Sequence, residues 1–100
     1  MFRKSLEDAL RDNNPKVLID LRKQEDYSKE TIPGAVNVYH KDFFRYAQRL
    51  SRNKRIYLFC YTGETSDEYA EYLSKRGYDI YSIEEGYHAY LRYKLKRMMN

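Results

Sequence analysis

The chain has 100 residues, which suits one domain whose apolar core needs neither metals nor disulfides. Hydrophobic residues make up 42% and charged residues 34%, a balance that excludes a disordered chain, and no apolar run approaches a membrane span. The one cysteine, Cys60, cannot form an internal disulfide, and the N-terminal residues lack the apolar segment of a signal peptide. We therefore expect a single cytoplasmic domain over residues 1–100 with no membrane partner.

The net charge of +4 is concentrated near the C-terminus. Basic and acidic residues balance over residues 1–90, and the excess comes from Arg92, Lys94, Lys96 and Arg97. A nucleic-acid-binding domain normally spreads a basic face over its fold, whereas cations near the end of a helix favour its dipole. The pattern predicts a solvated helix face and no nucleic-acid partner.

Short apolar runs alternate with helical patterns along the chain. In chain order, the expected elements are a helix after Ser5, a strand at 17–19, a short helix at 23–29, a strand at 35–38, a helix at 41–51, a strand at 56–59, a helix from Thr65 to Arg76, a strand at 79–83 and a helix after Gly86. Continuous apolar runs are typical of strands covered on both faces. The alternation predicts an α/β fold with a central, mainly parallel sheet and helices on both faces.

Signals near the ends of several helices support this interpretation. Ser5 with Asp8, and Thr65 with Glu68, resemble capping boxes, in which a side-chain hydroxyl accepts a hydrogen bond from a backbone N–H of the first helical turn. Gly77 follows two cations and predicts a left-handed helix end. The last helix carries a single apolar stripe, formed by Tyr87, Leu91, Leu95 and Met98.

Cys60 is the candidate nucleophile, because it ends the strand at 56–59 and begins a short loop that leads into a helix. Ligands of open α/β sheets bind outside the carboxyl ends of the strands. The N–H groups and positive dipole end of the following helix suit an anion, and so favour the nucleophilic thiolate over the thiol. Free cysteine can also be an inert, small apolar residue. Its position between a strand and a helix favours the reactive thiol.

Three stretches resemble the rhodanese (thiosulfate sulfurtransferase) family, specifically its single-domain members. Residues 18–37 look like the family's amino-terminal signature, residues 60–65 are similar to its six-residue active-site loop, and residues 77–86 resemble its closing strand and glycine turn. The resemblance spans residues 17 to about 90, and it implies a rhodanese-like α/β domain with no metal or organic cofactor.

The resemblance also implies a ping-pong sulfur transfer through Cys60. The cysteine would take the outer sulfur of thiosulfate or another donor, and a thiophilic acceptor such as cyanide or a protein thiol would then remove it from the persulfide. The side chains and backbone expected to bind the donor belong to Tyr61, Thr62, Gly63, Glu64, Thr65, Ser66 and Arg22. The loop would point backbone N–H groups at the sulfur, and the hydroxyls of Thr62, Thr65 and Ser66 could each donate a hydrogen bond to it.

Some residues depart from the family's pattern. The family often has histidine at the position of Thr31, glycine at that of Glu85 and tryptophan at that of Tyr90, differences that concern packing. Glu64 bears on the reaction itself, because a carboxylate in the loop disfavours a thiolate and repels thiosulfate. We hypothesise that the sulfur donor is a persulfide-bearing protein rather than free thiosulfate.

Several alternatives remain open from the sequence. A phosphatase or arsenate reductase of related design needs an arginine six positions after its cysteine, and Ser66 stands there instead. Asp20 and Arg22 are expected to be a structural pair at a strand end that fixes neighbouring loops, with Glu25 as a further partner of Arg22, or else Arg22 reaches the donor. His40 and His88 are lone histidines, so no metal site is expected. The main functional alternative is a non-catalytic rhodanese-like module that binds a protein partner.

Overall fold

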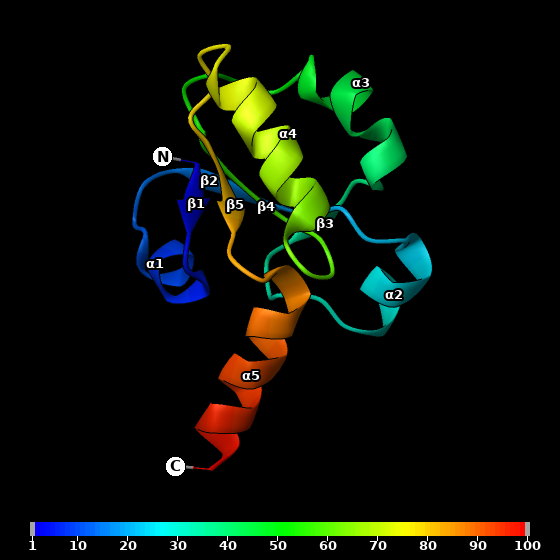
Figure 1. Cartoon of the computed structure of the whole chain (residues 1–100), viewed down its shortest axis with the longest axis vertical. Helices are drawn as coiled ribbons and strands as arrows, with labels where there is room; N and C mark the ends of the chain where they lie inside the picture. Colours follow the sequence, from blue (N-terminus) through cyan, green and yellow to red (C-terminus); the bar gives the residue numbers. More distant parts are fainter. Residues whose placement is uncertain (1, 100) are drawn as a thin grey trace.

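The computed structural model describes residues 2–99 (Figure 1). Its five strands form one sheet in the order β1-β5-β4-β2-β3, and every neighbouring pair is parallel. The strands are β1 (Arg3–Lys4), β2 (Lys16–Asp20), β3 (Val36–Asn37), β4 (Arg55–Phe59) and β5 (Ile80–Ile83). The predicted parallel α/β sheet is confirmed. Strand β1 was not predicted, since two residues show no periodicity and its pairing with β5 is a long-range contact.

The predicted helices are also present. They are α1 (Leu6–Arg11), α2 (Gln24–Lys29), α3 (Phe43–Ala47), α4 (Glu64–Ser74) and α5 (Gly86–Met98), and the 3-10 turn η1 (His40–Asp42) precedes α3. Helix α3 is shorter than the predicted span of 41–51, because its first turn is 3-10 and its last residues form turns.

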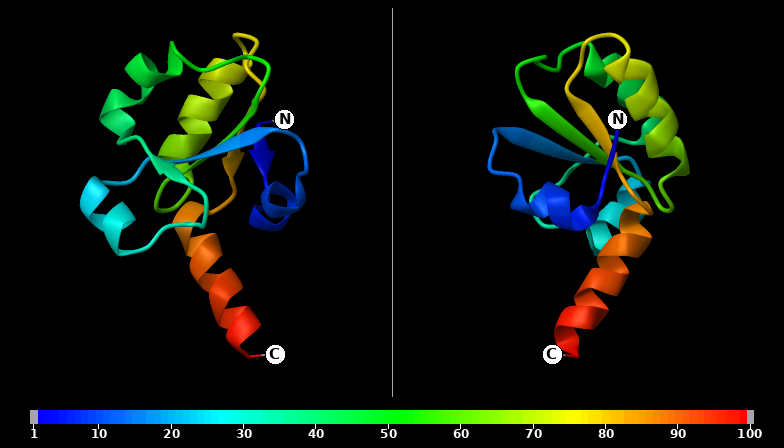
Figure 2. Two further views of the ribbon diagram at one scale, coloured as in Figure 1. Left: turned by 180° about the vertical axis from the view of Figure 1, so that it is seen from behind. Right: turned by 60° about the vertical axis from the view of Figure 1, so that its left-hand side comes forward.

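The sheet has a helical layer on each face, as predicted (Figure 2). The alternating side chains of β4 explain why both faces are apolar. Ile56 and Leu58 pack in the core that α3 and α4 cover, whereas Tyr57 and Phe59 pack in the core that α1 and the start of α5 cover. Cys60 continues the first of these rows, so its side chain lies on the α4 side of the sheet.

One of the two predicted capping boxes is wrong. Ser5 Oγ accepts a hydrogen bond from Asp8 N at 3.1 Å, as expected at the start of α1. Helix α4 instead begins at Glu64, one residue before Thr65, and its N-cap residue is Gly63, with a φ of 102° and no side-chain hydrogen bond. The loop after Cys60 is therefore tighter than the sequence indicated.

The apolar stripe of α5 lies mostly outside the core. Tyr90 is buried, but Leu91, Leu95 and Met98 are 42%, 58% and 80% exposed. Figure 1 shows the reason: after its first turns, α5 extends away from the sheet and from the other helices. The buried residues of α5 are Gly86, which lies against the loop after β4, and Tyr90, which packs in the same core as Leu6 and Ala9.

Glu85 is strained, and we predict that Glu85→Gly stabilises the protein. Among residues 2–99 it is the only non-glycine residue with a positive φ, at 60°. Glycine removes this strain but also raises the conformational entropy of the unfolded chain. The first effect should outweigh the second, so the free energy of unfolding measured by urea denaturation should rise by about 0.5–1 kcal/mol. Glu84→Gly, an exposed neighbour, is the control and should not stabilise the protein. If Glu85→Gly instead lost as much stability as Glu84→Gly, the claim that Glu85 is strained would be contradicted.

Gly86→Ala should have the opposite effect. A Cβ at Gly86 would lie 2.3 Å from the carbonyl oxygen of Cys60, a distance that forces the backbone to move. We expect unfolding to become easier by about 3 kcal/mol or more. Gly77→Ala is the matched control, because that glycine also has a positive φ but open space around it. If urea denaturation showed equal losses of stability for Gly86→Ala and Gly77→Ala, the close contact with the Cys60 carbonyl would have no energetic effect.

Candidate active site

The loop after β4 folds back onto the sulfur of Cys60. Gly63 N donates a hydrogen bond to Cys60 Sγ at 3.1 Å. Glycine suits position 63 for two reasons. Its backbone adopts the left-handed conformation that this turn needs, and a Cβ there would lie 3.1 Å from the backbone nitrogen of Glu85. Cys60 is 7% exposed, so the sulfur lies at the floor of the site rather than on the surface.

Two helix N-termini meet at this loop (Figure 1). Helix α4 begins directly after Gly63, and the N–H groups of its first turn have no partner within the helix. Helix α5 contacts the other side of the loop: Tyr87 N donates to the carbonyl of Cys60 at 2.8 Å, and His88 N to that of Tyr61 at 3.3 Å. The carbonyls at the start of the loop are thus bound by α5, and the positive ends of two helix dipoles lie beside Cys60.

A pair of buried serines lies beside the sulfur. Ser66 Oγ is 3.6 Å from Cys60 Sγ, 3.2 Å from the carbonyl oxygen of Gly63 and 2.7 Å from Ser82 Oγ. Both serines are 0% exposed. Ser66 was predicted from the sequence, but Ser82, on β5, was not. The signal that could have indicated it is a hydroxyl in the middle of an otherwise apolar or aromatic strand.

The hydroxyls of Thr62 and Thr65 form no hydrogen bond to Cys60 Sγ in the part of the chain that the structure describes. Within residues 2–99, the hydrogen-bond partners of the sulfur are Gly63 N and Ser66 Oγ. Thr62 is exposed and Thr65 is half-buried. Their contacts to a donor, like those of exposed Glu64, stay predictions.

Arg22 is buried and pairs with Asp20 at the end of β2, as expected for a structural pair, whereas the expected pairing with Glu25 is not formed among residues 2–99. Arg22 Nη2 lies 2.9 Å from Asp20 Oδ2 and also donates to the carbonyl of Glu30 at 2.5 Å. Burial opposes the charged guanidinium, but the hydrogen bonds and charge of Asp20 outweigh it and raise the pKa of Arg22. These contacts join the loops that follow β2 and α2, and the predicted contact of Arg22 with a donor stays a prediction.

Two tyrosines connect this ion pair to the cysteine loop. The Arg22 guanidinium lies 3.8 Å from the ring centroid of Tyr87 and 5.7 Å from that of Tyr61. The hydroxyl of Tyr61 donates to Asp26, and that of Tyr87 donates to Glu30. Burial and Glu30 raise the pKa of Tyr87 to about 12, so its hydroxyl remains a protonated donor at neutral pH. The two tyrosines thus connect the Asp20–Arg22 pair to the cysteine loop, Tyr61 from within the loop and Tyr87 from the start of α5.

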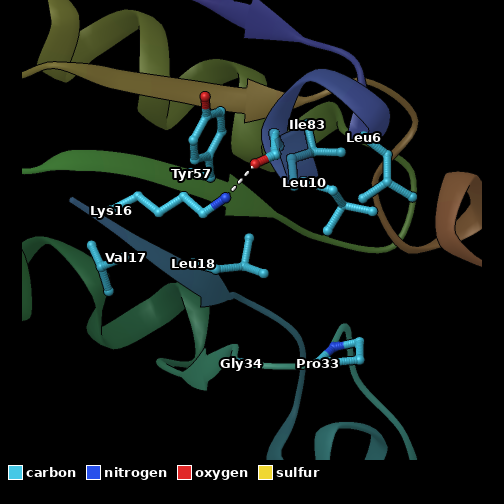
Figure 3. Close-up of a pocket in the computed structure, with 10 residues that line it drawn as sticks. Leu6, Leu10, Lys16, Val17, Leu18, Pro33, Gly34, Tyr57 and Ile83 are labelled. Atoms are coloured by element: carbon cyan, nitrogen blue, oxygen red, sulfur yellow. Dashed lines mark hydrogen bonds between the residues drawn. The ribbon is translucent and has the colours of Figure 1, made fainter. Parts of the chain in front are cut away.

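An apolar cavity lies apart from this site (Figure 3). It has a volume of about 230 Å³ and lies between α1, β2 and the turn at Pro33, on the face of the sheet opposite to the Cys60 sulfur. Lys16 Nζ donates to the carbonyl of Ala9 at 2.6 Å at its edge. The loop of residues 60–66 does not line it.

The histidines occupy the places expected from the sequence. His40 begins η1 and His88 is exposed on α5. Among residues 2–99, no group of three or more His, Cys, Asp or Glu side chains is arranged to hold a metal ion. No helix in the same part of the chain has the length and apolar character needed to cross a bilayer.

Known proteins with similar sequences include two named as sulfurtransferases. The chain is 39% identical over 67 residues to a tRNA sulfurtransferase from Pyrobaculum aerophilum, an alignment that covers 67% of this chain and 14% of that protein. It is 28% identical over 72 residues to the thiosulfate sulfurtransferase GlpE of Coxiella burnetii, covering 71% of this chain and 67% of that one. The chain thus spans most of one relative and a small part of the other.

A solved structure shares the fold of this chain, and a family model matches its sequence. A rhodanese-related protein from Thermoplasma volcanium has the same fold, with a TM-score of 0.82 at 20% identity over 92% of each chain. The family model of the rhodanese-like domain matches residues 2–93, which include the sheet, the cysteine loop and most of α5. The chain therefore belongs to the rhodanese-like domain family.

Proposed function

We propose that this protein is a sulfurtransferase that carries sulfur on Cys60 as a persulfide. The observation that supports this most directly is the position of the sulfur: it accepts a hydrogen bond from Gly63 N and lies beside the N-termini of α4 and α5. This surrounding suits a thiolate and, after reaction, the anionic outer sulfur of a persulfide. Relatives named as sulfurtransferases support the same reaction class.

The reaction consists of two displacements at sulfur. The Cys60 thiolate attacks the outer sulfur of the donor, a new S–S bond forms, and the donor's S–S bond breaks with its electron pair leaving on the donor. With thiosulfate the leaving group is sulfite. A thiophilic acceptor, such as cyanide or a thiolate, then attacks the outer sulfur of the persulfide, and the Cys60 thiolate is regenerated. No net oxidation or reduction and no resident cofactor is needed.

The loop would bind the donor mainly through its backbone. The N–H groups of Glu64 and Thr65, in the first turn of α4, have no partner within the helix and can receive the anionic outer sulfur. Ser66 adds a hydroxyl beside the inner sulfur. Tyr61, Thr62 and Glu64 are the exposed residues of the loop, where a donor would arrive.

The charge of the site favours a donor other than free thiosulfate, and we propose a persulfide carried by a protein. Residues 60–66 include no cation, and exposed Glu64 brings a carboxylate. Arg22, the one cation predicted to assist, has its guanidinium on Asp20, so its positive charge is largely balanced. A dianion would be repelled, whereas a protein donor can place a single persulfide sulfur at the loop and gain affinity from contacts elsewhere.

The second candidate is a non-catalytic module that binds a protein partner through the same loop. The near burial of Cys60 and the acidic loop are the observations that favour it. In that case Cys60→Ser should keep partner binding intact, because the hydroxyl preserves the size and the hydrogen bonds of the buried side chain.

Incubation with thiosulfate should add one sulfur atom to the wild-type protein and none to Cys60→Ser. Intact-mass spectrometry detects the gain, and added cyanide should remove it as thiocyanate. If wild type gains no sulfur from thiosulfate or from cysteine persulfide while Cys60 can still be alkylated, the sulfurtransferase proposal fails and the binding module remains.

The donor preference gives a second test. We expect cysteine persulfide to load Cys60 faster than thiosulfate does, and much faster loading by thiosulfate would overturn the proposed donor class. Glu64→Gln should raise kcat/KM for thiosulfate about threefold to tenfold, since it removes one charge from a partly solvated site. Glu71→Gln, farther along α4 and also exposed, is the matched control and should change the value less than twofold.

A further inference from the structure

We propose that Ser82 is a positioning residue that directs the hydroxyl hydrogen of Ser66 onto the sulfur of Cys60. This inference rests on the proposed role of Cys60 as a thiolate nucleophile. Ser82 lies on β5, sixteen residues from Ser66 along the chain, and their hydroxyl oxygens are 2.7 Å apart. Together with Cys60 Sγ they form a continuous chain of three polar atoms inside the core.

The number of hydroxyl hydrogens on the two serines indicates which of them donates to the other. Each hydroxyl has one hydrogen to donate and can accept two. Within the described part of the chain, Ser66 Oγ is the hydrogen-bond partner of Ser82 Oγ, whereas Ser66 Oγ also meets the carbonyl of Gly63 and the sulfur. If Ser66 donated to Ser82, it would have no hydrogen left for either. Donation from Ser82 to Ser66 leaves the Ser66 hydrogen free.

The free hydrogen can follow the charge of the sulfur. With a neutral thiol, the Ser66 hydroxyl donates to the carbonyl of Gly63, its partner at 3.2 Å. When Cys60 becomes an anion, the same hydroxyl can rotate and donate to the sulfur, which Gly63 N already contacts at 3.1 Å. A hydrogen bond donated by Ser82 to Ser66 Oγ polarises the Ser66 hydroxyl and strengthens its donation to the anion.

The fold itself does not require a hydroxyl at this position. Ser82 is 0% exposed, and its neighbours on the strand are Tyr81 and Ile83. A buried hydroxyl contributes little net stability compared with an apolar side chain of the same shape. The hydroxyl chain therefore serves the sulfur, the one group at its end whose charge changes.

The experiment measures the rate of Cys60 alkylation by iodoacetamide as a function of pH. Ser66→Ala should lower the rate at neutral pH about tenfold, since a hydrogen bond to a charged group is lost, and Ser82→Ala about threefold. In both variants the midpoint of the profile should move to higher pH. Ser74→Ala is the control, since its hydroxyl bonds to the carbonyl of Glu71 on the outer part of α4.

Two substitutions of nearly equal shape separate the effect of the hydroxyl from the effect of packing. Ser82→Thr retains the hydroxyl and Ser82→Val removes it, with nearly the same side-chain volume. The charged and titratable groups on the elements packed around the loop are the same in every variant. They include the Asp20–Arg22 pair, Asp26, His40, Tyr61, Glu64, Asp67, Glu68, Tyr69, Glu71, Tyr72, Tyr81, Glu84, Glu85, Tyr87, His88, Tyr90 and Arg92. A difference between Thr and Val in the midpoint of the profile therefore reports the hydroxyl.

A merely structural role predicts a different result. Loosening the core would expose the nearly buried sulfur and speed alkylation without moving the midpoint, and that outcome overturns the proposal. So does an unchanged profile in folded Ser82→Ala and Ser82→Val. Alkylation needs no sulfur donor, so failure of wild type to take up sulfur would reject the proposed function and leave this test unaffected.

Discussion

The contact between Gly86 and the carbonyl of Cys60 is the constraint on which the site depends. Gly86 has no Cβ, and any larger residue would meet that oxygen at 2.3 Å. The close approach lets Tyr87 N bind the same carbonyl, so α5 begins against the loop that follows β4. With that side of the loop fixed, Gly63 turns its N–H toward the sulfur. One small residue on α5 thus determines how a loop more than twenty residues earlier presents its amides.

The groups around Cys60 in the candidate site are dipoles rather than cations. The positive ends of α4 and α5, the amide of Gly63 and the hydroxyl of Ser66 surround Cys60, while Glu64 adds a negative charge at the rim. Dipoles of this kind favour a single buried anion at short range but attract little from a distance. This combination is the basis for the proposal that a bulky donor delivers the sulfur atom and that a small dianion from solution does not.

The buried ion pair of Asp20 and Arg22 belongs to the framework of the site. Asp20 accepts hydrogen bonds from the Arg22 side chain and backbone and from Thr31 Oγ1. Such a pair is weak evidence for stability, but loss of either partner leaves an unpaired buried charge. Because Arg22 also stacks on Tyr87, the pair links the loops after β2 and α2 to the start of α5.

The sequence by itself determined the order of strands and helices, the parallel sheet and the position of Cys60 at the end of a buried strand, because these follow from local periodicity and turn residues. It did not determine strand β1, the contact of Arg22 with the carbonyl of Glu30 or the contact of Ser82 with Ser66. Those depend on contacts between segments distant in the chain, such as β1 with β5 and Ser66 with Ser82. The helical pattern of α5 was visible in the sequence, but its exposed stripe was not. Only the packed structure sets the direction in which that helix leaves the sheet, and so which of its apolar side chains are buried.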